Sequence, residues 1–122
     1  MRRYAATDLP EVAGWYAARA LRAPTADMLP DCGVIVQGVA AGWLYGTDSA
    51  VCLLDGYITN PAASPEDRNA ALDAITGELL AAARGRGFRH VIAYTGTPSI
   101  EARAISHGFL AAGSRRMLER GL

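Results

Sequence analysis

The 122-residue sequence predicts a single domain of mixed α/β class, in which about three helices flank a mixed, mostly antiparallel sheet with one parallel strand pair. Three runs rich in apolar and β-branched residues lie between residues 33 and 59, separated by glycine-containing turns, as is typical of an antiparallel meander. Helical periodicity is found on both sides of this meander, over residues 8–22 and 64–85. An apolar strand over residues 88–95 follows the second helix, and a strand–helix–strand connection nearly always makes a parallel pair.

Composition and charge disfavour several classes of partner. The chain contains 12 acidic and 12 basic residues without a long run of either sign, which argues against nucleic acid or a membrane surface as the main partner. No apolar stretch reaches the roughly 18 residues that a membrane-spanning helix needs. The two cysteines, Cys32 and Cys52, lie in different settings and suggest no disulfide framework, which favours a reduced cytoplasmic compartment. The two histidines and two cysteines also lack the spacing of a metal site.

The first third of the chain contains a short strand, a helix and a loop. Residues 2–6 are expected to form the strand, and Asp8 and Glu11 then provide the N-cap and the capping-box glutamate of a helix that ends before Pro24. Residues 23–32 contain two prolines and no sustained period, so we expect a loop that covers a cleft.

The last third predicts two further helices and several strands. Ser64 is the expected N-cap of the second helix, which ends at the glycines 85 and 87. A short helix begins at Thr97-Pro98 and ends at Gly108, and two brief strands around Gly113 complete the chain. The predicted order of elements is therefore β-α-β-β-β-α-β-α-β-β.

Four residues, Pro65-Glu66-Asp67-Arg68, resemble the Pro-Glu-x-Arg that opens the pyrophosphate loop of the GNAT superfamily, the acyl-CoA-dependent N-acetyltransferases. Residues 103–109, Arg-Ala-Ile-Ser-His-Gly-Phe, resemble the last helix of that family, which runs into a Gly-Phe pair. With the order of the elements, the resemblance covers nearly the whole chain, and it extends in particular to the short GNAT-like proteins of phages and prophages.

The resemblance implies acetyl-CoA as cofactor and a parallel strand pair that splays apart. The pantetheine arm would pair with the splayed strand edge, and the pyrophosphate would lie at the start of the following helix, where free amides and the helix dipole favour an anion. The implied cofactor-binding residues are Tyr57, Ile58, Thr59, Arg68, Asn69 and Ala71. Ser99 and Arg103, on the last helix facing the presumed cleft, are further candidates, and a solvated helix face is the alternative interpretation of both.

The pyrophosphate loop departs from the family pattern Arg/Gln-x-x-Gly-x-Gly/Ala. Here Ala71 and Asp73 stand at the two small-residue positions, and Glu66 and Asp67 add two carboxylates to the first helical turn. An ordinary capped amphipathic helix explains the same residues, because Ser64 and the acidic side chains satisfy the amides that would otherwise bind phosphate. The sequence leaves both interpretations open.

Acetyl transfer to an amine needs a base and an acid. Asp55 interrupts an apolar run next to Gly56 and is the candidate base, although alternation could equally place it on the solvent face or beside a β-bulge. The position at which the resemblance implies a tyrosine acid is Ala104. Tyr94, at the end of a strand, is the substitute candidate, and Tyr57 is a second choice; packing of either ring on a half-buried face is the alternative.

Two functional hypotheses follow. The first is an acetyl-CoA-dependent N-acetyltransferase that acts on a small-molecule or peptide amine in the cytoplasm. The second is a catalytically inactive GNAT-fold protein, an accessory or virion-associated interaction module of a phage or prophage, with a second copy or a phage protein as partner. Four aromatic residues are expected mainly in the core, and an exposed cluster of them would mark an interface: Trp15, Tyr16, Trp43 and Tyr45.

Overall fold

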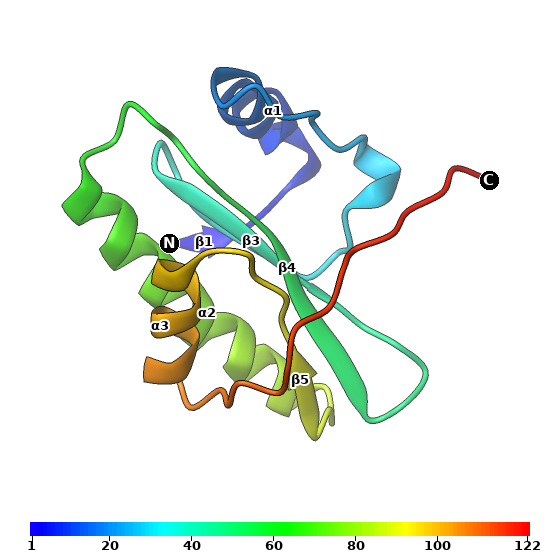
Figure 1. Cartoon of the computed structure of the whole chain (residues 1–122). Coiled ribbons are helices and arrows are strands. Elements are labelled where there is room, and N and C mark those ends of the chain that lie inside the picture. The colour runs from blue at the N-terminus through cyan, green and yellow to red at the C-terminus, as the bar shows by residue number, and fades with distance from the viewer.

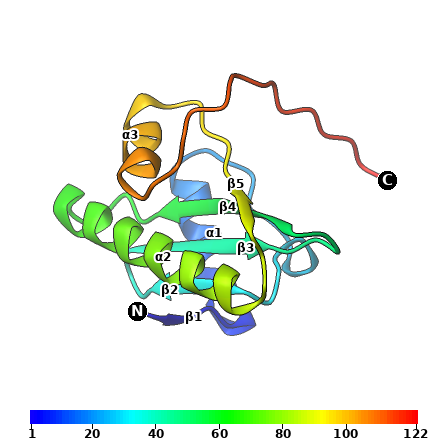
Figure 2. The ribbon, with the colours of Figure 1, turned by 90° about the horizontal axis from the view of Figure 1, so that it is seen from below.

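The structure, a computed structural model, describes residues 1–122 and contains one five-stranded sheet with helices on both of its faces (Figures 1 and 2). The strands follow the chain in the order β1-β2-β3-β4-β5, and only the last pair, β4 with β5, is parallel. Their bounds are β1 (Arg2–Arg3), β2 (Gly33–Val36), β3 (Ala40–Tyr45), β4 (Val51–Thr59) and β5 (His90–Ile92).

Three α-helices and two short 3-10 turns complete the fold. The helices are α1 (Leu9–Ala18), α2 (Pro65–Gly85) and α3 (Pro98–Ser106), and the turns span Ala6–Asp8 and Ala26–Met28. Helix α1 covers one face of the sheet, and α2 covers the other with α3 beside it (Figure 2). The predicted fold class is confirmed: a mixed, mostly antiparallel sheet with one parallel pair and three helices. None of these helices is long and apolar enough to span a membrane.

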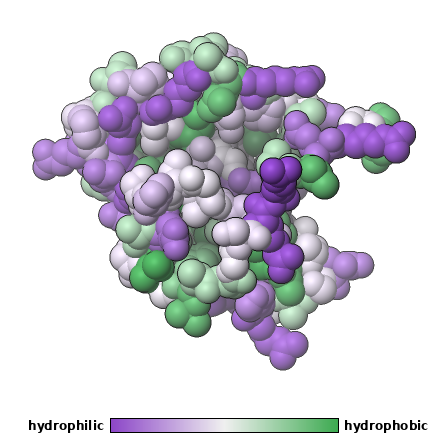
Figure 3. All heavy atoms as spheres, in the orientation of Figure 1, coloured by the Kyte–Doolittle hydropathy of each residue, from purple (hydrophilic) through white to green (hydrophobic).

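The core is divided by the sheet into two clusters, because successive strand residues point to opposite faces. The cluster on the α1 side consists of Val12, Trp15, Ile35, Ala41, Trp43 and Ile58. The cluster on the α2 side is larger and consists of Cys32, Val34, Ala40, Leu44, Cys52, Leu54, Ala71, Ile75, Leu79 and Ala83. Outside them, hydrophobic and hydrophilic residues are interspersed on the face that Figure 3 shows.

Trp43 is the largest fully buried side chain, and residues of neighbouring segments pack closely against its indole ring. It lies opposite Gly33 of β2, and a Cβ atom on Gly33 would clash with the indole Nε1. Tyr4 packs edge-on against the indole with ring centroids 5.0 Å apart. A glycine at position 33 is therefore required by packing, since a larger residue would displace the indole.

The predicted α2 helix is confirmed at both ends. The Ser64 hydroxyl accepts a hydrogen bond from the Asp67 N–H at 3.0 Å, Pro65 occupies the first turn, and Gly87 has a φ of +86° just beyond the helix. A side-chain N-cap and a left-handed glycine are the local signals that the sequence displays. The three strands of the meander are also confirmed within one residue or two of their predicted bounds.

The N-terminal prediction was partly wrong. The strand is two residues long instead of five. Asp8 occupies the N-cap position of α1 as predicted, but its side chain makes no capping hydrogen bond to the helix. Its carboxylate instead accepts two hydrogen bonds from the Arg2 guanidinium, at 2.7 and 2.9 Å, and one from the Ala5 N–H at 2.8 Å. Glu11, the expected capping-box residue, accepts a hydrogen bond from the Gly38 N–H at 2.9 Å. Both carboxylates thus tie α1 to neighbouring segments and leave its first turn without a side-chain cap.

Helix α1 also ends earlier than predicted, at Ala18 instead of residue 22. Ala20 adopts a left-handed conformation with a φ of +55°, which stops the helix one turn before Pro24. Arg19 is then free to reach β4, where its Nε donates to the Thr59 carbonyl at 3.0 Å. The hydrogen bond from Arg19 to β4 thus takes the place of the additional helical turn that the periodicity predicted.

The C-terminal predictions were partly wrong, both before and after α3. The strand predicted over residues 88–95 is only His90–Ile92, and no strand forms around Gly113. Residues 109–122 have no regular structure, and Leu110, Met117 and Leu118 are at least four-fifths exposed. Apolar and charged residues occur there in adjacent pairs, so each face of a strand would carry both kinds, and neither face could be buried.

We expect Asp8→Asn to reduce the free energy of unfolding by about 1–3 kcal/mol at neutral pH, because the buried Asp8 carboxylate loses its charge-assisted hydrogen bonds from the partly exposed Arg2. The hydrogen bonds from Arg2 lower the pKa of Asp8 below its usual range, against the effect of burial and with the help of the Ala5 N–H. This stabilisation is complete above the unfolded pKa of about 3.9 and is lost as the pH falls through the lower folded pKa. Urea unfolding at a series of pH values should show the two proteins converging at acidic pH.

The matched control is Asp48→Asn, in the exposed turn between β3 and β4, where the carboxylate makes no ion pair. This variant should change the free energy of unfolding by less than about 0.5 kcal/mol at any pH. Equal stability of the two variants at neutral pH would contradict the role assigned to Asp8.

Candidate functional site

A β-bulge interrupts β4 in its second half. Ala41 pairs with Ile58 and Trp43 pairs with Asp55, so Gly56 and Tyr57 of β4 lie opposite the single residue 42 of β3. Gly56 has a φ of +72°, which is the left-handed conformation that a bulge of this kind assigns to glycine. The bulge changes the direction of β4 at the point where Asp55 is located.

The edge of β4 beyond the bulge is open. Only residues 51–53 of β4 pair with β5, and from residue 54 onward no strand lies beside β4 on that side. The two strands diverge there (Figure 1), which gives the splayed parallel pair. Two carbonyl groups of this open segment accept hydrogen bonds from side chains instead of a strand: Gly56 from the Tyr16 hydroxyl at 3.2 Å, and Thr59 from Arg19 at 3.0 Å.

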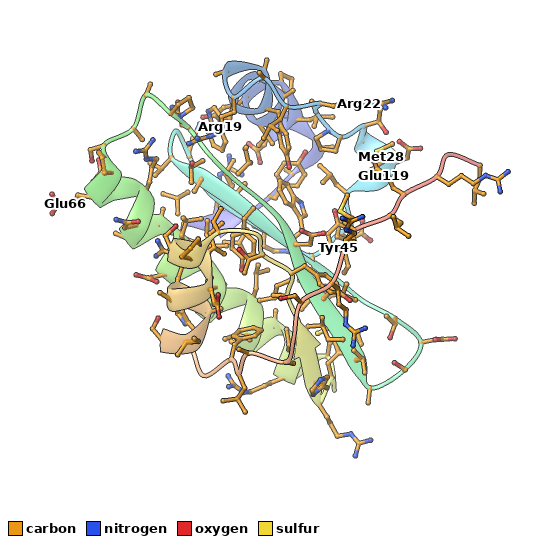
Figure 4. All side chains as sticks on the ribbon, in the orientation of Figure 1. Arg19, Arg22, Met28, Tyr45, Glu66 and Glu119 are labelled. Carbon is orange, nitrogen blue, oxygen red and sulfur yellow. The ribbon has the colours of Figure 1, made fainter.

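Asp55 is exposed on the α1 side of the sheet, and two tyrosines lie around the adjacent bulge. The Tyr16 hydroxyl contacts the Gly56 carbonyl, and the Tyr45 hydroxyl would lie 3.6 Å from a Cβ atom on Gly56. Burial raises the pKa of both tyrosines, and the negative charge of Asp55 raises each further. The Tyr45 hydroxyl also donates to the Met28 carbonyl at 3.4 Å, which links the site to the loop after α1 (Figure 4).

The other sequence-predicted residues of this region lie in different places. Tyr57 points to the opposite face, where its hydroxyl is 3.2 Å from the Thr76 hydroxyl of α2 and burial raises its pKa against the effect of that hydrogen bond. Ile58 is buried in the α1-side cluster. Tyr94 follows β5 and is 60% exposed, without a hydrogen bond to any other residue. The structure thus places the Tyr57 hydroxyl on the α2 side of the sheet, away from Asp55, and gives the Tyr94 side chain no hydrogen bond to Asp55, Tyr16 or Tyr45.

The start of α2, where the resemblance implies the pyrophosphate, uses most of its own amides. Pro65 has no N–H, the Asp67 N–H bonds to the Ser64 hydroxyl, and the Arg68 N–H bonds to the Ser64 carbonyl. The Glu66 N–H alone has no partner in this turn. Residues 69–73 lie within the helix, where their N–H groups bond along the helix axis, and the methyl group of Ala71 is buried against the sheet.

The outer face of α2 carries a cluster that sequence reasoning did not find. Arg103 of α3 donates to the Asp73 carboxylate at 2.9 Å, and to the carbonyl and side-chain oxygens of Asn69 at 3.1 and 2.8 Å. His107 Nε2 lies 3.2 Å from the same Asp73 oxygen. Burial alone would raise the pKa of Asp73, but His107 and Arg103 together hold it below its usual range. The signal in the sequence was the spacing of four between Arg103 and His107, which places both on one helix face.

These contacts define how far the chain fits acetyl-CoA. The open edge of β4 beyond Gly56 offers a strand-like partner for an extended amide chain, and Thr59 lies at its end. The start of α2 does not offer a row of free amides, and Arg103 is committed to Asn69 and Asp73. Arg68 remains partly exposed at that end of the helix, and Ser99 is exposed in the first turn of α3. No three His, Cys, Asp or Glu side chains gather closely enough to hold a metal ion.

Comparison with known proteins supports the architecture. No protein-family model matches the sequence, and no curated protein matches it. Among solved structures, the chain resembles one described as "Putative acetyltransferase from Agrobacterium tumefaciens str. C58", with a TM-score of 0.69, 15% sequence identity and 98% of each chain covered. At this identity the match shows a shared fold over nearly the full length of both chains.

We expect Arg103→Gln to loosen α3 from α2, because it removes the ion pair with Asp73 and the hydrogen bonds to Asn69. A loss of about 1 kcal/mol would increase amide hydrogen exchange in residues 98–107 about fivefold, while the sheet should exchange as before. Arg84→Gln is the control, because Arg84 is exposed near the end of α2 and makes no ion pair. If amide exchange in α3 is the same in both variants, Arg103 does not hold α3 on α2 through its contacts with Asp73 and Asn69.

Proposed function

We propose that this chain transfers an acetyl group from acetyl-CoA to a primary amine of a small molecule or peptide. A fold by itself does not establish a function, so the proposal depends on the site. The observation that carries it is the open, bulged segment of β4, which has an exposed carboxylate, Asp55, next to the point where the strand edge becomes free. The fold shared with a structure described as an acetyltransferase adds support.

Asp55 is the proposed general base. A primary amine is protonated at neutral pH and becomes a nucleophile only after it loses a proton, which Asp55 would accept directly or through a water molecule. Acetyl-CoA supplies the acetyl group in activated form, as a thioester. The new C–N bond forms as the C–S bond breaks, and the second proton that the amine nitrogen then loses passes to solvent. Much of the rate would come from holding the two substrates side by side.

The leaving thiolate needs a proton, and two tyrosines were candidates for the acid. The Tyr57 hydroxyl is engaged with Thr76, and its ring packs against α2. Tyr94 is exposed at the end of β5, so we assign the role to Tyr94 or to solvent. An exposed acid would contribute only modestly to the rate of acetyl transfer, because a water molecule can protonate the thiolate in its place.

For the cofactor, we propose contacts along β4 and at the start of α2. Tyr57, Ile58 and Thr59 would offer backbone groups to the pantetheine arm. The side chain of Arg68, with Ser99 of α3, would supply phosphate contacts in place of the amides that α2 uses internally. Arg103 would add a contact only by giving up its bonds to Asn69 and Asp73. The carboxylates of Glu66 and Asp67 oppose an anion at the same place, so binding should be weak for an enzyme of this fold.

A second candidate function is a non-catalytic one: a GNAT-fold accessory or virion-associated interaction module of a phage or prophage. The observation that favours it is the start of α2, where amides and Arg103 already have partners within the chain. A domain that no longer binds acetyl-CoA would keep the same sheet and helices. Measured cofactor binding separates the two candidates.

Calorimetry with acetyl-CoA and CoA tests the proposal. We expect binding that is detectable in the micromolar to millimolar range, and acetyl transfer to an amine that Asp55→Asn reduces by at least about a hundredfold, the usual contribution of a general base. The Asp55→Asn variant should still bind acetyl-CoA, and Asp48→Asn should retain full activity. Absence of both heat and a thermal shift at millimolar acetyl-CoA would exclude the enzyme and favour the interaction module.

A further inference from the structure

The bulge of β4 is surrounded by oxygen atoms from four separate elements. Tyr16 comes from α1, Tyr45 from β3 and Met28 from the 3-10 turn after α1, and Asp55 lies on β4 itself. Both tyrosine hydroxyls converge on Gly56, one at 3.2 Å from its carbonyl and one at 3.6 Å from where its Cβ atom would be. Asp55 shares this face of the sheet and is diagonal to Tyr45 across the strand pair, a distance that an aromatic side chain spans.

The hydrogen bonds of these groups leave only acceptors for a ligand. A tyrosine hydroxyl has one proton, and both protons are already donated: from Tyr16 to the Gly56 carbonyl, and from Tyr45 to the Met28 carbonyl. The oxygen of each hydroxyl can therefore only accept a further bond. An ionised Asp55 likewise accepts and cannot donate. An alkylammonium group, with three N–H donors and no acceptor, complements such a set.

The surroundings of the site also disfavour a ligand that carries a negative charge in addition to its ammonium group. The loop segment from Thr25 to Asp31 carries two exposed carboxylates, Asp27 and Asp31, and no basic side chain. Arg19 is held by Thr59, and Arg22 lies on the exposed segment between α1 and this loop (Figure 4). The tyrosine rings and the half-exposed Met28 side chain offer apolar surface to the rest of a ligand.

We propose that Asp55, Tyr16 and Tyr45 form a subsite for the ammonium group of a primary amine with an apolar or aromatic body and no carboxylate. The inference rests on the proposed function, in which this amine is the acetyl acceptor and Asp55 takes its proton. The subsite excludes free amino acids, because their carboxylate would face the carboxylates of Asp55 and the loop.

Phenylethylamine is a suitable probe, and its binding can be measured by calorimetry or by ligand-observed NMR without acetyl-CoA. We expect millimolar or tighter binding to the wild-type chain, and at least about tenfold weaker binding of phenylalanine and of N-acetylphenylethylamine, which lacks the charge. Asp55→Asn should weaken phenylethylamine binding about tenfold, and Tyr45→Phe should weaken it severalfold although the ring is retained. Asp48→Asn should bind like the wild type.

Two results would contradict the proposed amine subsite. One is no binding of phenylethylamine to the folded wild-type chain at several millimolar, and the other is equal affinity of the wild type and the Asp55→Asn variant. Thermal unfolding of each variant confirms that a loss of binding does not reflect a loss of fold. Because acetyl-CoA is absent from this experiment, its outcome is separate from that of the proposed function. A chain that binds the amine but not acetyl-CoA would support the subsite and contradict the proposed acetyltransferase activity.

Discussion

The contact between the β4 bulge and Trp43 is the constraint on which the rest of the structure depends. Along β4, Cys52 and Leu54 face α2, so strict alternation would put Ile58 on the α2 side as well. The extra residue at the bulge reverses this order, and Ile58 instead joins the α1-side cluster while Tyr57 packs on α2. Gly56 makes the reversal possible, since a Cβ atom there would press on the Trp43 ring at 3.0 Å.

One irregular residue thus serves both the core and the site. The bulge allows both halves of β4 to bury apolar side chains on both faces, and the strand leaves β5 in the same region. It also places Asp55 at the surface beside two tyrosine hydroxyls. The open strand edge is an exposed set of polar groups, which a folded chain usually covers. Here Tyr16 and Arg19 cover part of it and leave the remainder free for a ligand.

The sequence predicted those parts of the fold that local signals determine. The meander and α2 were correct because glycine turns, alternating apolar residues and the Ser64 cap act over a few positions. The clamp between Arg103 and Asp73 was not predicted, because it joins residues 30 positions apart, and the Tyr16 contact with Gly56 spans 40 positions. Such contacts depend on how α1 and α3 pack on the rest of the fold, which periodicity does not specify. For the same reason the sequence identified Asp55 as a candidate but not the tyrosines beside it.

Hydrogen exchange along β4, with and without acetyl-CoA, tests the central claim that the open edge beyond the bulge receives the cofactor. The amides of residues 51–53, already paired with β5, should be protected in both states. Amides of residues 56–60 that face the open edge should become protected only when acetyl-CoA is added at saturating concentration. Unchanged exchange in residues 56–60 while acetyl-CoA demonstrably binds would place the cofactor elsewhere and contradict this account.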